Sequence, residues 1–438
     1  VELYDKFFKT AFPRMVEKLG IVYTPVEVVD FIIHSVADVL KKEFGRSISD
    51  ENVHILDPFT GTGTFITRLL QSGLIDKKDL QRKYTKEIHA NEIVLLAYYI
   101  AAVNIENTYH DLIGSKEFHP FEGMCLTDTF QLGESDASEK LFSKMFPQNS
   151  ERVSRQKKAP IKVIIGNPPY SIGQKSANDN AQNQKYLRLD ARVEATYARA
   201  SNAGLSKSLY DAYIKAFRWS TDRLDSEFGG ILCYVSNGAW LDGNSLDGFR
   251  KCLEEEFSSI HVFDLRGNQR TSGELSRKEG GKIFGSGSRT PIAITLLVKN
   301  PKATNEKATI HYHDIGDYLK REEKLELIQD FGSVVNTKMK WRRIKPDDSN
   351  DWLNQGSVVF DTLIPLNPKK KYSNKEQSFF CTYAIGVATN RDAWTYGSTA
   401  ANVQEQMQRT IAFYNNERAK YTTKKGSNAR ALVEDVVD

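Results

Sequence analysis

The sequence lacks the features that mark membrane-anchored, secreted and zinc-binding proteins. No apolar run approaches the roughly 20 residues that a membrane-spanning helix needs, and no signal-peptide pattern opens the chain. The 438 residues include only four cysteines, which stand far apart and form no metal-ligand pair. This spacing suits a reducing cytosol better than a disulfide scaffold or a zinc site. We therefore expect a cytoplasmic protein with no bound metal and no membrane partner.

A second absence concerns the glycine-rich turn HILDPFTGTGTF at residues 54–65, which matches neither common phosphate-binding pattern. Ile66 stands where the dinucleotide fingerprint needs its third glycine, and no Gly-Lys-Ser/Thr follows. The turn nevertheless comes after an apolar strand that ends in Asp57, and it precedes a helix. Gly61 and Gly63 would let backbone approach a ligand closely, and the helix start adds a positive dipole end. The pattern suits a nucleoside without a pyrophosphate.

Charge and length leave several functions open. Net charge is only +4, which is compatible with a polyanionic partner but does not identify one. At 438 residues the chain is long enough for about two or three domains. It begins with Val1 rather than Met, and we expect it to be a segment of a longer polypeptide.

Short apolar strands alternate with helical stretches in the middle of the chain, which predicts an α/β fold with a largely parallel sheet. A helix with one apolar face is expected within residues 26–44. The strands are expected at residues 53–57, 87–91, 124–128, 162–167, 230–236, 260–266 and 291–299.

Composition then divides the chain. Residues 171–207 are rich in small polar residues, and we expect a mobile insertion there. The alternation is lost after about residue 316, where two basic stretches with aromatic neighbours occur, KMKWRRIK and PKKKYSNK. We predict a helical extension at 1–20, a main domain at 21–315 and a second, incomplete module at 316–438. The basic stretches are either phosphate contacts or solvated loops.

Acidic residues stand at the ends of three successive predicted strands. Asp57 ends the first strand, Glu92 follows the second and Asp128 follows the third. A carboxylate at Glu92 can take both hydroxyls of a ribose, and Asp128 can accept from an exocyclic amine with Phe130 against a purine ring. Each acid alone also fits an ordinary turn or a helix start. Because ligands in open α/β sheets bind at the carboxyl edge, the three together predict a nucleoside site there.

The stretch VYTPVEVVDF at residues 22–31 predicts a helix start. Thr24 is expected to be the N-cap, Pro25 to lie in the first turn, and Glu27 to complete a capping box. Capping alone explains these residues. A free amide end could also meet a ligand carboxylate, which makes Tyr23 and Thr24 candidate contacts.

Another strand ends at Gly166 and runs into the corner Asn167-Pro168-Pro169-Tyr170. Proline ends a strand and asparagine is a common turn residue, so a purely structural turn is one explanation. The same rigid corner beside a nucleoside site is the other.

Taken in order, YTP, DPFTGTGTF, NEI, TDTF and GNPPY resemble the gamma group of S-adenosylmethionine-dependent adenine-N6 DNA methyltransferases. The flanks FFKTAFPRMVEKLGIVYTP, GGKIFGSGSRTPIAITLLVKNP and YAIGVATNRDAWTYG resemble the methyltransferase part of single-polypeptide Type I-like (Type ISP) restriction–modification enzymes. The resemblance implies a class I methyltransferase fold, with a Rossmann-like, mostly parallel seven-stranded sheet and a partial target-recognition module. It also implies double-stranded DNA as partner, nuclease and helicase domains in the same longer polypeptide, and a bacterial cytoplasm.

The resemblance also implies roles for single residues. Asn167 Oδ1 and the carbonyl of Pro168 would accept the two N–H groups of the target adenine, Pro169 would make the corner rigid, and Tyr170 would stack on a base rotated out of the duplex. S-adenosylmethionine would be bound by Tyr23, Thr24, Asp57, Pro58, Phe59, Gly61, Gly63, Glu92, Asp128 and Phe130. Two alternatives stay open: a methyltransferase acting on RNA or on a protein amide, and a non-catalytic subunit that reads DNA.

Overall fold

The computed structural model describes most of the chain, in several stretches. In the first 356 residues these are 24–114, 117–134, 146–169, 185–203, 207–284 and 289–356; beyond them they are 359, 362–366, 377–380, 386, 389 and 395–427. The chain divides into two compact units, residues 1–356 and residues 357–438. The predicted extension at 1–20 and the basic stretch PKKKYSNK lie outside the described residues.

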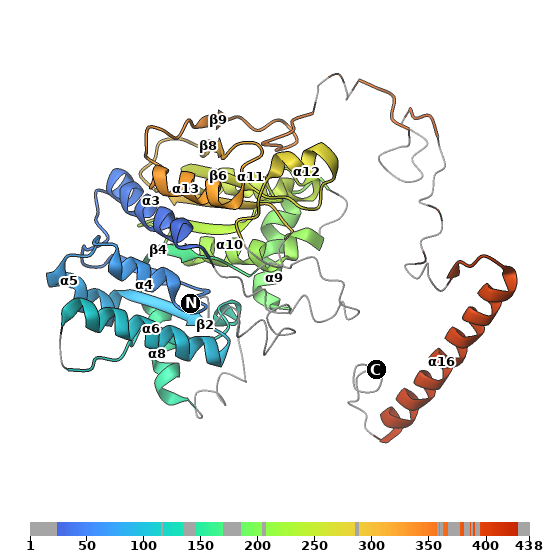
Figure 1. Cartoon of the computed structure of the whole chain (residues 1–438), viewed down its shortest axis with the longest axis horizontal. Helices are drawn as coiled ribbons and strands as arrows, with labels where there is room; N and C mark the ends of the chain where they lie inside the picture. The colour runs from blue at the N-terminus through green and yellow to red at the C-terminus, as the bar shows by residue number, and fades with distance from the viewer. Residues whose placement is uncertain are drawn as a thin grey trace. The chain divides into compact units, whose positions relative to one another are not determined.

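Unit 1 is built on one nine-stranded sheet with the order β3-β2-β1-β4-β5-β7-β6-β8-β9 (Figure 1). All seven predicted strands are present, and they form the continuous part from β3 to β6. The strands are β1 (His54–Asp57), β2 (Ile88–Glu92), β3 (Met124–Leu126), β4 (Ile161–Gly166), β5 (Gly230–Asn237), β6 (Ser259–Arg266), β7 (Ile292–Lys299), β8 (Thr309–Asp314) and β9 (Arg342–Ile344).

The sheet is parallel from β3 to β5, and β7 runs antiparallel to both of its neighbours. Beyond the expected seven strands, β8 pairs in parallel with β6, and β9 pairs antiparallel with β8. Strand β9 was not predicted because it is three residues long and two of them, Arg342 and Arg343, are exposed. An apolar alternation cannot be recognised in so short a stretch.

Helices cover both faces of the sheet. On one face α13, α3, α4 and α6 pack side by side in that order, and α8, α9, α10 and α11 lie on the other (Figure 1). None of the helices in the described part of the chain is long and apolar enough to cross a membrane. The helices are α3 (Val26–Phe44), α4 (Thr64–Gln71), α5 (Lys77–Arg82), α6 (Leu95–Ile113), α8 (Pro147–Lys158), α9 (Leu187–Val193), α10 (Ala212–Arg223), α11 (Asp247–Glu256), α12 (Gly273–Glu279), α13 (Arg321–Phe331) and, in unit 2, α16 (Ala400–Ser427).

Residues 316–356 pack within unit 1, so the structural division lies after Gly356, whereas the sequence placed a boundary after residue 315. Helix α13 packs on α3, and the N–H of Val334 donates to Ser35 Oγ at 3.0 Å. The fully buried Arg250 donates to the Asn350 carbonyl at 2.8 Å. Apolar side chains such as Ile328 and Trp352 are also buried here, but they are spread over a helix, turns and a three-residue strand, so no regular alternation marks the region in the sequence. The stretch KMKWRRIK therefore contributes β9 to unit 1.

The predicted mobile insertion at 171–207 is wrong for residues 185–203. They form α9 and a further helical turn, and they bury Leu189, Val193 and Tyr197 against the sheet's second helical layer. Apolar residues at helical spacing within a polar run fixed this helix. Residues 171–184 and 204–206 lie outside the described residues.

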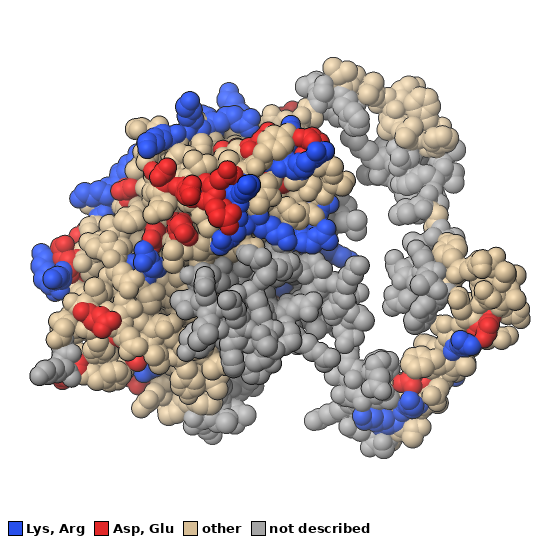
Figure 2. Space-filling view, viewed as in Figure 1, with Lys and Arg blue, Asp and Glu red and all other residues tan. Residues whose placement is uncertain are grey.

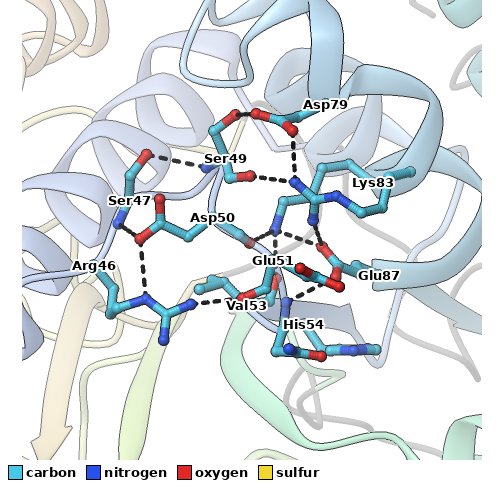
Figure 3. A network of polar contacts seen from close by, with 12 residues as sticks. Arg46, Ser47, Ser49, Asp50, Glu51, Val53, His54, Asp79, Lys83 and Glu87 are labelled. Atoms are coloured by element: carbon cyan, nitrogen blue, oxygen red, sulfur yellow. Dashed lines mark hydrogen bonds and ion pairs between the residues drawn. The ribbon is translucent and has the colours of Figure 1, made fainter.

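Hydrogen bonds and ion pairs of charged side chains connect the amino ends of β1 and β2 (Figure 3). Lys83 is fully buried, and its Nζ donates to the carbonyls of Asp50 at 2.6 Å and Val53 at 2.9 Å. It also pairs with Glu87 Oε2 at 2.9 Å, and Arg82 Nη1 donates to the same oxygen at 2.5 Å. We call these five residues the amino-edge clamp. Burial lowers the pKa of Lys83.

Candidate functional site

The predicted site residues meet at the opposite, carboxyl edge of the same strands. Strand order changes direction between β1 and β4, which is where open α/β sheets bind ligands. Asp57 ends β1 and Glu92 ends β2, while Asp128 and Asn167 come just after β3 and β4. All four therefore lie at the carboxyl edge of neighbouring strands.

Asp57 is completely buried, and half of its carboxylate has no partner. Oδ1 accepts from the Phe59 N–H at 3.1 Å, whereas Oδ2 has no hydrogen bond. Burial, with a smaller contribution from the charge of Glu92, raises the pKa of Asp57 to about 8. Gly166 allows this arrangement, because a Cβ there would come within 2.8 Å of Oδ1. An unpaired buried acceptor of this kind is costly unless a ligand satisfies it.

The two glycines of the turn are both required by its geometry. Gly61 has φ +58°, and its N–H donates to Glu92 Oε2 at 2.8 Å. Gly63 has φ +90°, and a Cβ there would lie 3.3 Å from both Ala101 and Ile105 in α6. The turn is therefore tied to the end of β2 and pressed against α6. The predicted close approach of this backbone to a ligand stays a prediction.

Glu92 is half-buried, and each of its carboxylate oxygens accepts a hydrogen bond from a backbone N–H. Its Oε1 accepts from the Val94 N–H at 2.7 Å, in addition to the bond from Gly61. Burial raises the pKa of Glu92 to about 7, and these two hydrogen bonds oppose the rise. Each carboxylate oxygen keeps a second lone pair with which it can accept from a ligand.

Asp128 lies among aromatic rings. Its Oδ1 accepts from the Phe130 N–H at 3.0 Å, and its Oδ2 accepts from the Tyr186 hydroxyl at 2.8 Å. The ring of Phe130 lies 5.5 Å from Phe59 and 5.3 Å from Tyr186 between centroids. Burial raises the pKa of Asp128. Sequence reasoning missed Tyr186 because it falls in the segment predicted to be mobile; the apolar spacing of Leu189 and Val193 was the available signal.

The loop after Asp57 is fastened to the loop after β3. The Thr129 hydroxyl donates to the Pro58 carbonyl at 2.5 Å, and Asn91 Nδ2 donates to the same hydroxyl at 3.2 Å. Pro58, Asn91 and Thr129 are all buried. The Asp-Pro-Phe run is thus held from two neighbouring strands, which places Phe59 beside Phe130.

The Asn167 corner ends β4, and its amide is oriented by a residue far away in the chain. Asn167 Nδ2 donates to Thr24 Oγ1 at 3.1 Å, which leaves Oδ1 buried and without a hydrogen-bond partner. Pro168 is buried and Pro169 half-buried. Tyr170 and Tyr23 lie outside the described residues.

The predicted capping box at the start of α3 is wrong. The helix begins at Val26 with Pro25 as its N-cap, and no side chain caps it. The carbonyl of Pro25 accepts from the N–H groups of Val28 and Val29, both at 3.1 Å. Thr24, which is 6% exposed, instead offers its hydroxyl to Asn167. Capping and ligand contact were both considered for Thr24, but a bond to Asn167 could not be seen from local spacing.

Two family models match the chain. Residues 72–270 match the Eco57I restriction-modification methylase, and residues 378–435 match the Type ISP C-terminal specificity domain. No curated protein matches the chain. The first model spans Glu92, Asp128 and Asn167, and the second includes all of α16.

Three solved structures are similar over nearly all of the chain. A nuclease-deletion mutant of the Type ISP restriction-modification enzyme LlaGI, in complex with a DNA substrate mimic, is 48% identical, with a TM-score of 0.85 over 95% of this chain. The ATP-dependent Type ISP enzyme LlaBIII, bound to DNA, is 44% identical, with a TM-score of 0.87 over 95%. The DrdV–DNA complex is 37% identical, with a TM-score of 0.85 over 94%.

The chain resembles the methyltransferase segment of Type ISP restriction–modification enzymes. It spans 32%, 28% and 39% of the LlaGI, LlaBIII and DrdV chains, so about a third of each relative corresponds to this sequence. Of the two units, unit 1 carries the Type ISP-like methylase fold, and unit 2 carries the match to the specificity domain.

Proposed function

We propose that this chain is the methyltransferase part of a Type ISP-like enzyme, and that it transfers a methyl group from S-adenosylmethionine to the N6 atom of a flipped adenine in double-stranded DNA. The observation that carries the proposal is the buried Asn167 Oδ1, which has no hydrogen-bond partner and stands at the same sheet edge as the unpaired Asp57 Oδ2. Buried acceptors without partners are rare, and they are expected where a ligand supplies the donors.

The residues present fit S-adenosylmethionine. Glu92 would accept from the ribose hydroxyls and Asp128 from the exocyclic amine of the cofactor's adenine, while Phe59 and Phe130 would border its ring. Asp57 Oδ2, unpaired and buried, favours a ligand with positive charge or N–H donors nearby. When bound, the cofactor supplies a methyl group on a sulfonium sulfur. Gly61, Gly63, Pro58, Tyr23 and Thr24 complete the proposed set.

The Asn167 corner would provide the chemistry on the base. An adenine amino nitrogen is a weak nucleophile, because its lone pair is delocalised into the ring. Asn167 Oδ1 and the Pro168 carbonyl would accept its two N–H groups and favour the tetrahedral, positively charged transition state. Thr24 fixes which end of the Asn167 amide faces the site, since its hydroxyl accepts from Nδ2. The proton can leave after transfer, so no strong base is needed beforehand.

We also propose that double-stranded DNA is the substrate and that nuclease and helicase parts belong to the same longer polypeptide. The supporting facts are that LlaGI and LlaBIII are described with DNA, that LlaBIII is ATP-dependent, and that the LlaGI structure is of a nuclease-deletion mutant. Tyr170 would stack on the extruded base.

A product analysis tests the proposal. The complete enzyme would be incubated with labelled S-adenosylmethionine and cognate duplex, and the DNA digested to nucleosides for mass spectrometry. We expect N6-methyl-2′-deoxyadenosine as the labelled product. Label in cytosine, in RNA or in protein would overturn the substrate assignment. A wild-type enzyme that binds DNA but shows no calorimetric binding of S-adenosylmethionine would instead be a non-catalytic reader.

A further inference from the structure

The connection between β6 and β7 is a surface segment at the same edge of the sheet as the Asn167 corner. Strand β7 begins at Ile292, which pairs with Asn237 at the carboxyl end of β5, and the Gly238 N–H donates to the Pro291 carbonyl at 2.8 Å. Strand β4, which leads into Asn167, lies directly beside β5. We call residues 267–284 the basic segment.

The residue that leads into the basic segment is held in an uncommon conformation. Arg266 has φ +56°, at an irregularity in the pairing of β6 with β7. Its guanidinium contacts both oxygens of Asp314, with distances of 2.7 Å and 2.6 Å, and also pairs with Asp317. A left-handed non-glycine residue persists only where its surroundings determine it, and such residues cluster at functional sites.

A buried lysine fastens both ends of the basic segment. Lys324 is fully buried, and its Nζ donates to the carbonyls of Leu265, Glu279 and Gly281 at 2.8, 2.8 and 2.9 Å. The Gly281 N–H in turn donates to the Leu319 carbonyl at 2.8 Å. An ordinary surface loop has no need of a buried cation with three carbonyl partners. The fixation is typical of a segment that must present its side chains in a defined place.

The side chains that the segment presents are mostly basic. It contains Arg270, Arg277, Lys278 and Lys282 against two acids, Glu274 and Glu279. Both acids have partners: Glu279 accepts from the Asn268 N–H at 2.9 Å, and Glu274 accepts from the Tyr318 hydroxyl at 2.5 Å and pairs with Arg277 Nε at 3.3 Å across one turn of α12. Of the four cations, the first three are exposed. On the face seen in Figure 2, basic and acidic side chains lie next to one another over this part of unit 1.

We propose that the basic segment contacts the sugar-phosphate backbone of the DNA beside the target adenine. The inference rests on the proposed function, because it needs DNA at this edge of the sheet. Exposed cations on a rigid support can neutralise phosphates without reading sequence, and they fix the register of the duplex relative to the Asn167 corner. The fixation by Arg266 and Lys324 then keeps these contacts at a constant distance from the reacting base.

The test compares two charge-matched variants of the complete enzyme. Arg277→Ala/Lys278→Ala removes two exposed cations from α12, and Lys77→Ala/Lys78→Ala removes two exposed cations from α5, which precedes β2 near the amino edge. DNA affinity is measured by fluorescence anisotropy over a range of salt concentrations. We expect the α12 variant to lose about 0.9 units of slope in log K against log salt for each contact removed, on cognate and random duplexes alike.

We expect the α5 variant to keep the wild-type slope. Equal slopes in the wild type and both variants would overturn the proposal and point to a protein surface instead. Labelled methyl transfer by the wild type, measured alongside at saturating DNA, separates this failure from failure of the proposed function. If methyl transfer to adenine is normal and the slopes are equal, only the proposal for the basic segment is overturned, and the proposed function stands. If the wild type binds DNA without transferring methyl groups, the proposed function fails whatever the slopes show.

Discussion

The two edges of strands β1 and β2 differ in whether their buried polar groups have hydrogen-bond partners. At the amino edge Lys83, Arg82 and Glu87 satisfy one another and two carbonyls, so the buried charges have partners. At the carboxyl edge Asp57 Oδ2 and Asn167 Oδ1 are equally buried and have none. A satisfied network rigidifies a core, whereas an unsatisfied buried acceptor carries a cost that a ligand donor can remove. We therefore propose that the first edge serves stability and the second serves binding.

Breaking the amino-edge clamp should have the largest effect, and it should fall on stability. Lys83→Met removes a buried cation and leaves two carbonyls and part of Glu87 without donors, so we expect the free energy of unfolding to fall by about 3 kcal/mol. Urea denaturation measures the loss. Lys86→Met, an exposed lysine in the same turn, is the control and should change stability little. Similar losses in both variants would contradict the assignment.

Asn167→Ala should show the opposite profile. It removes an acceptor that has no partner in the fold and one hydrogen bond to Thr24, so the free energy of unfolding should fall by at most about 0.5–1.5 kcal/mol. Single-turnover methyl transfer should fall on the order of 10²-fold or more. Affinity for S-adenosylmethionine should stay close to that of the wild type. Near-normal transfer by this variant would reject the corner as the catalytic centre.

Glu92→Ala should weaken cofactor binding by roughly 1.5–3 kcal/mol, the range for a hydrogen bond to a charged group. Isothermal titration calorimetry measures it. The structure adds a complication that the test must separate, because Glu92 also holds the Gly61 N–H. Glu92→Gln keeps an acceptor for that bond, and it should recover the turn without recovering the full affinity. Unchanged affinity in the alanine variant would remove Glu92 from the ribose role.

Thr24→Val should have the smallest effect, on rate alone. Loss of one hydrogen bond to Asn167 Nδ2 should lower the transfer rate up to about tenfold, in line with a net worth of about 0.5–1.5 kcal/mol. Thr24→Ser keeps the hydroxyl and should restore the rate. If Thr24→Val instead loses cofactor affinity with the rate unchanged, and Thr24→Ser restores that affinity, Thr24 acts on the ligand and not on Asn167.

Whether a feature of the structure could be predicted from the sequence depends on whether the contacts that form it are local. The strands from β1 to β7 could be predicted because each has an apolar run ended by turn residues, and the acids at their ends followed from strand direction. Thr24 and Tyr186 could not be placed. Their partners, Asn167 and Asp128, are 143 and 58 residues away, and no spacing rule reports on such pairs.

The same limit explains the domain boundary. Residues 316–356 join unit 1 through α13, through buried apolar residues such as Ile328 and Trp352, and through long-range polar bonds such as that from Val334 to Ser35. Because these contacts are irregularly spaced, the sequence suggested that a separate module begins here. Only the fold shows that it completes the sheet.

The raised pKa values of Asp57, about 8, and Glu92, about 7, have a consequence for proton exchange with the solvent. Near neutral pH, Asp57 is largely protonated in the ligand-free protein and Glu92 partly so. A cationic ligand such as the proposed cofactor favours their ionised forms, so its arrival expels protons into the buffer. Apparent affinity should then rise as pH increases from about 6 to 8, and the heat of binding should differ between buffers of different ionisation enthalpy. Binding of the cationic ligand at this site would thus be coupled to the release of protons.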